Sequence, residues 1–338
     1  MKQVYIHIGL HKTGSTYIQK VFAENRDTLK AFGAIYPTLG AEFLFGHHNV
    51  AWSLMPNHVL KNTSDFTIER LLDYIESAGA KQFILSSEDF DFLQPEQISK
   101  IAHLFADYDV QIVMYVRNPV DAFYSYWQES VKHGDTRSIY DYLDQILANP
   151  KPLDYCQIAD NWAAIFGSSA MSFAIYENLV ADGIDIALYF LREIVKIDID
   201  IEQLAIPKKK VNPSSNAGAI EIIRQLNHIN LETNHASNIT ANFMTFLRQH
   251  PEGQKLQHHL QNESLASYDS LELSSLNETF LAVSDNFFRT YRKQIENTGS
   301  NQQLYNSQQH DTHQRVRVAN AEAVSKKIDI QKLYRLLN

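Results

Sequence analysis

Four short apolar segments, each joined to a helical pattern, constrain the fold of this chain more than any other feature. They are rich in β-branched and aromatic residues, and they read QVYIHIGL (3–10), KQFILSS (81–87), VQIVMYV (110–116) and AMSFAIY (170–176). The first leads directly into a helical pattern that runs from Ser15 to about Phe32, and each of the others follows one. This alternation predicts an α/β fold with a central parallel sheet flanked by helices.

The strand signals fade beyond about residue 178, and helical patterns dominate the rest of the chain. They include IDIALYFLREIV, AIEIIRQLNHI and LNETFLAVSDNFFRTYRKQI. The stretch 297–312 is polar and rich in Gln and Asn, which predicts a loop before a short terminal helix. The sequence therefore predicts an α/β core over 1–200, a helical part over 201–300 that completes the fold, and a polar loop with a terminal helix over 301–338.

Composition and charge exclude several classes of protein. The 338 residues are 44% hydrophobic, and a formal net charge of -9 argues against general binding to nucleic acids or anionic membranes. No stretch approaches the roughly 20 apolar residues of a membrane span, and the first strand begins too early for a signal sequence. We therefore expect a soluble cytoplasmic protein. Cys156 is the single cysteine, so we expect a buried, inert thiol rather than a disulfide or a thiolate metal site.

The stretch HIGLHKTGST, from His7 to Thr16, is similar to a phosphate-binding loop between a strand and a helix. A helix N-terminus presents unpaired N–H groups and partial positive charge, and Lys12 adds a full charge. However, the lysine precedes the second glycine, whereas loops that bind ATP or GTP place it afterwards. At this point phosphate binding and a simple turn capped by Ser15 or Thr16 both remain open.

A second candidate anion site lies in VRNPVDAFYSYW. Arg117 follows a strand directly, and Pro119 suits the first turn of a helix that carries Asp121 and Ser125 on one face. Arg117 can bind a phosphate with two parallel hydrogen bonds, with a hydroxyl added by Ser125. The alternative is an Arg117–Asp121 ion pair. Because the carboxyl ends of parallel strands meet at one edge of a sheet, the presence of two candidates there favours phosphate binding.

Together, HIGLHKTGSTYIQ and YVRNPVDAFYSYW resemble the sulfotransferase family, which has a P-loop NTPase-like fold. The family moves a sulfuryl group from 3'-phosphoadenosine 5'-phosphosulfate (PAPS) to a hydroxyl or amine. The resemblance covers about the first 195 residues and implies PAPS as the co-substrate. It implies the following cofactor-binding residues: His11, Lys12, Thr13, Gly14, Ser15 and Thr16 at the 5'-phosphosulfate, Arg117 and Ser125 at the 3'-phosphate, and Tyr17 and Tyr176 at the adenine.

A further stretch, KKKVNPSSN (208–216), resembles the Asn-x-Ser pattern of bacterial glycan-type members. A solvated lysine run before a capped helix is the alternative interpretation, and the role of this stretch stays open.

Sulfuryl transfer requires in-line placement, charge stabilisation and a base for the incoming hydroxyl, by analogy with phosphoryl transfer. Lys12 is the expected stabiliser of the leaving oxygen. Glu88, at a strand end in SSEDF, is the favoured base, and the pair His47 and His48 in FGHHNVAW ranks second as base and first as acceptor-site ligands. A capping role for Glu88 or Asp89 is the alternative. No metal is expected.

The sequence thus predicts a PAPS-dependent sulfotransferase that acts on a hydroxyl of a glycan, polysaccharide or glycolipid. In this interpretation the core over 1–200 binds PAPS, and the part over 201–300 lies on the acceptor side. The sequence is also compatible with a homo-oligomer. Two alternatives remain: a P-loop kinase or NTPase, although K-T-G-S-T lacks the G-K-[ST] order, and a non-catalytic sulfotransferase-like binding protein. The sequence does not identify the acceptor, the position sulfated or the oligomeric state.

Overall fold

A computed structural model describes residues 1–56, 58–59, 66–149, 153–207, 216–233, 238–261, 268–271, 277–295, 304 and 316–337. The chain divides into two compact units, each built from three separated stretches. The first comprises Met1–Asn118, Asp154–Asn212 and Val283–Leu304, and the second comprises Pro119–Leu153, Pro213–Ala282 and Tyr305–Asn338. The contiguous functional division at residues 200 and 300 stays a prediction.

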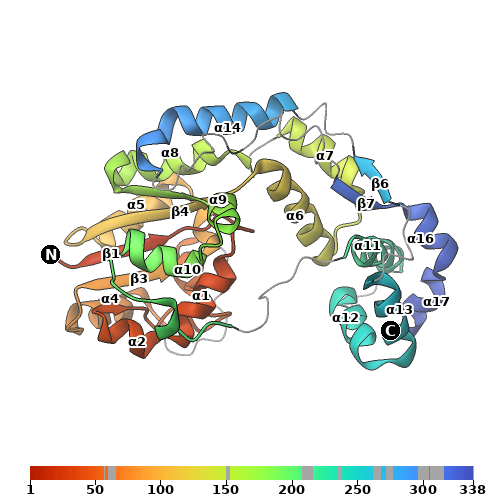
Figure 1. Ribbon diagram of the computed structural model, residues 1–338, viewed down its shortest axis with the longest axis horizontal. Helices are drawn as coiled ribbons and strands as arrows, with labels where there is room; N and C mark the ends of the chain where they lie inside the picture. The colour runs from red at the N-terminus through yellow and green to blue at the C-terminus, as the bar shows by residue number, and fades with distance from the viewer. Residues whose placement is uncertain are drawn as a thin grey trace. The chain divides into compact units, whose positions relative to one another are not determined.

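The first unit is built on a five-stranded parallel sheet in the order β2-β3-β1-β4-β5 (Figure 1). Its strands are β1 (Gln3–His7), β2 (Ala34–Ile35), β3 (Gln82–Ser86), β4 (Asp109–Val116) and β5 (Met171–Ile175). The predicted central parallel sheet is confirmed, with the short edge strand β2 in addition. His7 lies opposite Ser86 of β3 and Val113 of β4, so the segments that follow β1 and β3 begin at the same level of the sheet.

Helices cover both faces of this sheet, as the alternating pattern predicts (Figure 1). Those of the first unit are α1 (Ser15–Glu24), α2 (Arg26–Ala31), α3 (His48–Leu54), α4 (Ile68–Ser77), η1 (Glu88–Phe92), α5 (Pro95–Leu104), α8 (Tyr155–Phe166), η3 (Ser168–Ala170), α9 (Tyr176–Ala181), α10 (Ile186–Tyr189), η4 (Phe190–Ile194), η5 (Ile201–Gln203) and η7 (Arg292–Gln294). Tyr5 and Val113 of the sheet share one core with Phe22 of α1 and Phe190 of η4. The helix α8 packs on β4 and β5, and α5 packs against α8.

The helix predicted from Ser15 to about Phe32 is divided into α1 and α2 at Asn25. The side-chain amide of Asn25 donates to the carbonyls of Val21 at 2.7 Å and of Ala205 at 3.0 Å. Its amide oxygen accepts from the Ala205 N–H at 2.7 Å. A short polar side chain that bonds to backbone groups competes with helix propagation, which explains the break.

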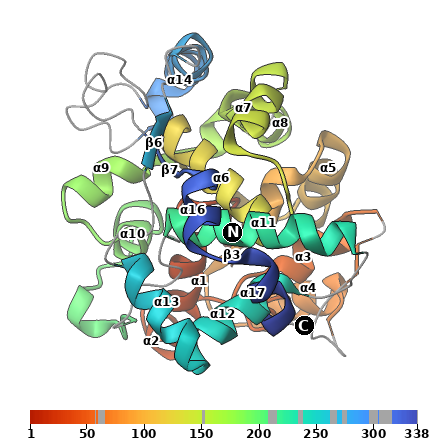
Figure 2. The same cartoon turned by 90° about the vertical axis from the view of Figure 1, so that its right-hand side faces the viewer.

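The described helices of the second unit are α6 (Pro119–Lys132), α7 (Ile139–Ala148), α11 (Ala217–Glu232), α12 (Ile239–Gln249), α13 (Pro251–Gln261), α16 (Ala321–Lys327) and α17 (Ile330–Leu337). The helix α14 (Asn277–Tyr291) runs through the boundary between the units at Val283. α11 packs against α6, α12, α16 and α17, as can be followed in Figure 2. The predicted helical C-terminal part is confirmed, and one antiparallel pair, β6 (Tyr268–Leu271) with β7 (Val316–Ala319), was not predicted.

No helix in the described ranges is long and apolar enough to cross a membrane. The predicted burial of Cys156 is confirmed, and that burial raises the pKa of its thiol. Most of the predicted loop at 297–312 lies outside the described residues.

Candidate active site

The loop between β1 and α1 is shaped by three residues with left-handed backbone. Gly9, Lys12 and Gly14 have φ of 93°, 66° and 86°. The loop stays attached to β4, since the Leu10 N–H donates to the Tyr115 carbonyl at 3.1 Å and the Tyr115 N–H to the Gly9 carbonyl at 2.7 Å. The chain then enters α1 directly. Successive N–H groups in such a mixed conformation form a concave surface suited to an anion.

The hydroxyl groups of this loop support it from within. Thr13 Oγ1 donates to the Leu10 carbonyl at 2.5 Å, and Ser15 Oγ donates to the same oxygen at 3.1 Å. Both side chains are buried. The N-cap of α1 is Gly14, which makes no side-chain cap, so the alternative of a turn capped by Ser15 or Thr16 is wrong. The partial positive charge at the N-terminus of α1 then suits an anion.

Gly14 is required here by space as well as by backbone conformation. A Cβ at this position would overlap Ile186 Cδ1 and lie 3.3 Å from Tyr176 Cε2. Tyr176, the first residue of α9, follows β5 directly. The loop therefore packs closely against the segment that follows β5.

Arg117 joins the ends of three strands. It lies just beyond β4, and its Nη1 donates to the Lys12 carbonyl at 2.6 Å. Its Nε lies 3.4 Å from Glu177 Oε1, and its guanidinium lies 5.4 Å from the centre of the Tyr176 ring. The structure thus brings together Lys12, Gly14, Arg117 and Tyr176, which the sequence placed at one sheet edge.

Tyr17, the other predicted adenine contact, is a partly buried residue of α1. Its hydroxyl donates to the carboxylate of Asp185, which also caps α10 by accepting from the Ala187 and Leu188 N–H groups at 2.9 Å. Burial and the Asp185 carboxylate raise the pKa of Tyr17. Tyr17 therefore ties α1 to α10 through its hydroxyl, and an adenine contact would have to use the face of its ring.

Some predicted residues belong to other parts of the chain. Ser125 and Asp121 lie on α6 of the second unit, and their roles stay predictions. Of KKKVNPSSN, only Asn216 is described, and it caps α11 by accepting from the Gly218 N–H at 2.8 Å.

Glu88 opens η1 immediately after β3, at the predicted strand end. The cap of this turn is Ser87, whose Oγ accepts from the Asp89 N–H at 3.1 Å, so Glu88 and Asp89 are not needed as caps. Glu88 Oε2 instead accepts from Gln19 Nε2 at 2.6 Å. Gln19 of α1 was not predicted, and a lone glutamine on an amphipathic helix gave no signal for it.

The adjacent histidines have different environments. His47 is fully buried; its Nδ1 accepts from the Ser86 N–H at 3.1 Å, and its Nε2 donates to the Pro37 carbonyl at 3.1 Å. Burial lowers the pKa of His47 to about 3, so the ring is neutral and both nitrogens are used. This geometry favours a structural role for His47 and argues against its use as a base or an acceptor ligand.

His48, in contrast, pairs with an acid. Its Nδ1 lies 3.1 Å from Asp89 Oδ2 and 2.9 Å from Ser87 Oγ. The ring stacks on Trp52, with ring centres 5.5 Å apart. A Cβ on Gly46 would lie 2.6 Å from Nε2, so this nitrogen is packed closely against the glycine.

His11 is held between two carboxylates of η1. Its Nδ1 lies 2.8 Å from Asp91 Oδ2, and its Nε2 lies 3.5 Å from Asp89 Oδ1. Burial lowers the pKa of His11, but the carboxylates of Asp91 and Asp89 outweigh burial and raise it to about 10. His11 is therefore a cation beside Lys12. Asp91 was not predicted, although the D-x-D spacing in SSEDFDF at a strand end was a signal for it.

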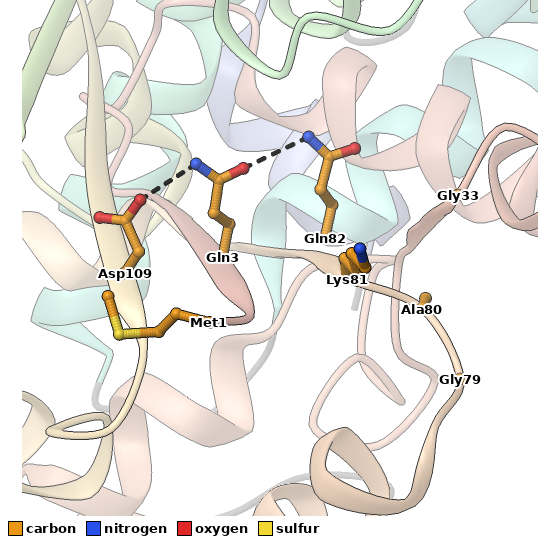
Figure 3. Close-up of a pocket in the computed structure, with 8 residues that line it drawn as sticks. All are labelled: Met1, Gln3, Gly33, Gly79, Ala80, Lys81, Gln82 and Asp109. Atoms are coloured by element: carbon orange, nitrogen blue, oxygen red, sulfur yellow. Dashed lines mark hydrogen bonds between the residues drawn. The ribbon is translucent and has the colours of Figure 1, made fainter.

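A pocket in the first unit lies at the opposite end of the sheet, among the amino ends of the strands (Figure 3). It is lined by Met1, Gln3, Gly33, Gly79, Ala80, Lys81, Gln82 and Asp109. Gln3 Nε2 donates to Asp109 Oδ2 at 3.0 Å, and Gln82 Nε2 donates to Gln3 Oε1 at 3.5 Å. None of the predicted site residues lines it. We place the candidate site at the carboxyl edge, where the charged side chains converge.

Among the described residues, no three His, Cys, Asp or Glu side chains form a group suited to a metal ion.

Comparison with known proteins identifies the family of this chain. The family model described as "Sulfotransferase domain" matches residues 3–221. No curated protein matches the chain. A solved structure, "Crystal Structure of Sulfotransferase from Alicyclobacillus acidocaldarius", is similar with 14% identity and a TM-score of 0.40, covering 69% of this chain and 96% of that one. Since the family model spans well over half of its length, this chain belongs to the sulfotransferase family. It is a sulfuryl transferase, and the family usually uses PAPS as donor.

Proposed function

We propose that this chain transfers the sulfuryl group of PAPS to a hydroxyl of a glycan, polysaccharide or glycolipid at the carboxyl edge of its five-stranded sheet. The observation that carries the proposal is the position of Arg117, whose guanidinium bonds to the Lys12 carbonyl and lies over Tyr176. One arginine thus links the loop that suits a phosphosulfate to an aromatic ring that suits the adenine of PAPS.

The donor would be held by residues of three strand ends. The N–H groups from Lys12 to Thr16 and the Lys12 ammonium would hold the 5'-phosphosulfate. Arg117, whose planar guanidinium suits two parallel bonds to a phosphate, would serve the 3'-phosphate, and the role of Ser125 stays a prediction. The rings of Tyr176 and Tyr17 would contact the adenine.

In the reaction, the acceptor oxygen attacks sulfur while the bond between sulfur and the bridging phosphate oxygen breaks. The electron pair of that bond goes to the phosphate oxygen of the departing adenosine 3',5'-bisphosphate. Lys12 would stabilise the negative charge that grows there, as a preorganised charge in a water-poor site does. Glu88 and His48 are the two candidate bases for the acceptor proton.

A carbohydrate acceptor is supported by two features. The stretch KKKVNPSSN resembles bacterial glycan-type members of the family. Aromatic rings surround His48: Trp52 stacks on it, and Phe43 lies against both, with ring centres 6.2 Å from His48 and 5.6 Å from Trp52. Trp52 is buried, so the partly exposed ring of Phe43 is the one proposed to meet the apolar face of a sugar ring.

Calorimetry tests the donor half of this proposal. The protein should bind adenosine 3',5'-bisphosphate without magnesium and more tightly than it binds ATP with magnesium. Lys12→Ala should weaken the bisphosphate, whereas Lys100→Ala, an exposed lysine of α5, should not. Binding of ATP with magnesium and none of the bisphosphate would instead support a kinase or NTPase and end this proposal.

A further inference from the structure

A four-residue turn before α3 has an unusual sequence for its backbone. Phe43 and Gly46 form an antiparallel bridge, and between them Leu44 and Phe45 have φ of 50° and 71°. Positive φ at both central residues is the pattern of a type I′ turn, which favours Asn-Gly. Here both positions hold bulky apolar residues, for which left-handed backbone is rare and strained. We name residues 43–46 the apolar turn, and Leu44 with Phe45 its tip.

Hydrogen bonds from buried groups hold the apolar turn in this conformation. The hydroxyl of Tyr36, a buried residue, donates to the Phe45 carbonyl at 2.7 Å. The His47 N–H donates to the Ser86 carbonyl at 2.6 Å, which attaches the turn to the end of β3. The apolar turn is therefore a fixed part of the carboxyl edge of the sheet.

Packing of the two tip side chains does not offset the strain. Leu44 is 58% exposed and Phe45 is 41% exposed, with the Lys20 ammonium 6.0 Å from the centre of the Phe45 ring. Single exposed apolar residues are common on protein surfaces, but a turn with only a structural role would be better served by Asn-Gly. Strain that is kept together with exposed apolar surface points to a function for the tip.

The apolar turn lies beside the residues proposed to meet the acceptor. A Cβ on Gly46 would lie 2.8 Å from Gln19 Cδ, and Gln19 Nε2 donates at 2.6 Å to Glu88, a candidate base. Phe43, the first residue of the turn, carries the ring proposed to meet a sugar. The tip is therefore next to the groups that would hold the sugar of an acceptor.

We propose that the tip binds a hydrocarbon chain attached to the acceptor sugar, so that the acceptor is a glycolipid rather than a free polysaccharide. This inference rests on the proposed function. A formal net charge of -9 opposes an anionic membrane surface as the partner of the tip. Two side chains are also far fewer than the roughly 20–30 residues that each side of a stable protein interface supplies. A hydrocarbon chain suits an apolar contact of this small size.

Partition of the labelled product tests the proposal with wild-type protein alone. The protein is incubated with sulfur-labelled PAPS and an extract of the source organism, and the product is divided between 1-butanol and water. Label should enter the butanol phase on a compound that contains both a sugar and a hydrocarbon chain. Label confined to the water phase, on a polysaccharide or a free sugar, overturns the inference. The absence of any labelled product overturns the proposed function instead.

The double variant Leu44→Asn with Phe45→Gly tests the tip itself. Because Asn-Gly suits the backbone of the turn, the urea midpoint should equal or exceed that of wild type. The initial rate of labelling in the butanol phase should fall by at least about 10-fold, because two apolar contacts with the hydrocarbon chain are lost. More extract should recover most of that rate, since acceptor binding is weakened and turnover is not. Affinity for adenosine 3',5'-bisphosphate should stay that of wild type.

Leu231→Asn changes an exposed leucine of α11 and is the matched control, which should label at the wild-type rate. A double variant that labels lipid as fast as wild type overturns the inference, as does a lost rate that more extract does not recover. A lower urea midpoint in the double variant would show that the tip serves the fold, which also overturns it. Wild type should not sediment with phosphatidylcholine vesicles that lack glycolipid. Sedimentation that the double variant loses would make the tip a membrane anchor and overturn the inference.

Discussion

The two ends of the five-stranded sheet carry different chemistry although the same strands form both. At the amino ends, the amides of Gln3 and Gln82 and the carboxylate of Asp109 bond to one another beside a pocket (Figure 3). At the carboxyl ends, Lys12 has left-handed backbone, and His11 is held between two carboxylates. Backbone strain and paired buried charges cost stability and are retained where they serve function.

The difference shows that a pocket alone does not locate the site. The pocket at the amino ends has polar groups that satisfy one another. The carboxyl edge has a buried acceptor, Gln19 Oε1, with no partner among the described residues. A buried polar group without a partner calls for an explanation, and at this edge a bound ligand would supply the missing donor. The predictions that follow test this contrast, beginning with the largest expected effect.

Lys12→Ala should lower kcat for sulfuryl transfer by about 100- to 1,000-fold, the loss typical of one preorganised group that stabilises a leaving oxygen. The thermal midpoint should stay near that of wild type. Lys81→Ala, at the amino-end pocket, is the matched variant and should leave kcat unchanged. A Lys12→Ala protein with full product yield would instead support a non-catalytic binding protein.

Arg117→Lys should weaken binding of adenosine 3',5'-bisphosphate by about 10- to 100-fold. The planar guanidinium of arginine can donate to the Lys12 carbonyl and to a phosphate at once, whereas a lysine ammonium lacks this rigid geometry. Arg192→Lys, in an exposed ion pair with Asp200, is the control and should bind as wild type. Calorimetry measures both. Unchanged affinity in Arg117→Lys would exclude the proposed 3'-phosphate role.

Gly14→Ala and Gly33→Ala compare two left-handed glycines at opposite ends of the sheet. Their φ angles are 86° and 89°, but a Cβ on Gly14 meets Ile186 and Tyr176, whereas one on Gly33 has nothing within 4 Å. Gly33→Ala should cost about 1 kcal/mol of unfolding free energy from backbone strain alone, and Gly14→Ala about 2–3 kcal/mol more from overpacking. Urea denaturation measures both losses of unfolding free energy. Equal losses would mean that the loop between β1 and α1 shifts to accept the extra methyl group without overpacking.

Stability should depend on pH in opposite ways at His11 and His47. The pKa of His11 is raised from 6.5 to about 10, so its contribution is complete below about pH 6.5 and is lost as pH rises toward 10. The pKa of His47 is lowered from 6.5 to about 3, so its contribution is present above 6.5 and is lost as pH falls toward 3.

Urea midpoints of His11→Asn and His47→Asn against wild type, measured across pH, check this prediction. The deficit of His11→Asn should shrink on the alkaline side, and that of His47→Asn should shrink on the acidic side. Two deficits that vary in the same direction would contradict the assigned charge states.

Lys81→Ala should also give the smallest effect on stability, within about 0.5 kcal/mol of wild type, as surface substitutions usually do. A large loss of stability in Lys81→Ala would show that the side chain of Lys81 contributes to folding at the amino ends of the strands.

The sequence predicted the sheet, the loop and the meeting of Lys12, Gly14, Arg117 and Tyr176, because these depend on periodicity and on strand ends that reach one edge. It did not predict the division of the first helix at Asn25, since that break needs a contact with Ala205, which is far away in the chain. Local patterns do not carry such contacts.

The roles of the histidines were also beyond the sequence. His47 and His48 are neighbours, and only their packing shows that one is buried against backbone groups and the other pairs with Asp89. Gln19 was missed because a glutamine gains meaning here only through Gly46 and Glu88, which come from other segments.

Transfer of sulfur label from PAPS tests the central claim most directly. Wild type and Lys12→Ala are incubated with labelled PAPS and an extract of the source organism, and labelled products are separated and identified. The proposed site predicts that wild type labels a hydroxyl-bearing compound and releases an equal amount of adenosine 3',5'-bisphosphate, while Lys12→Ala does neither. Wild-type protein that binds the bisphosphate but transfers no label, or a Lys12→Ala variant that transfers as much as wild type, would contradict it.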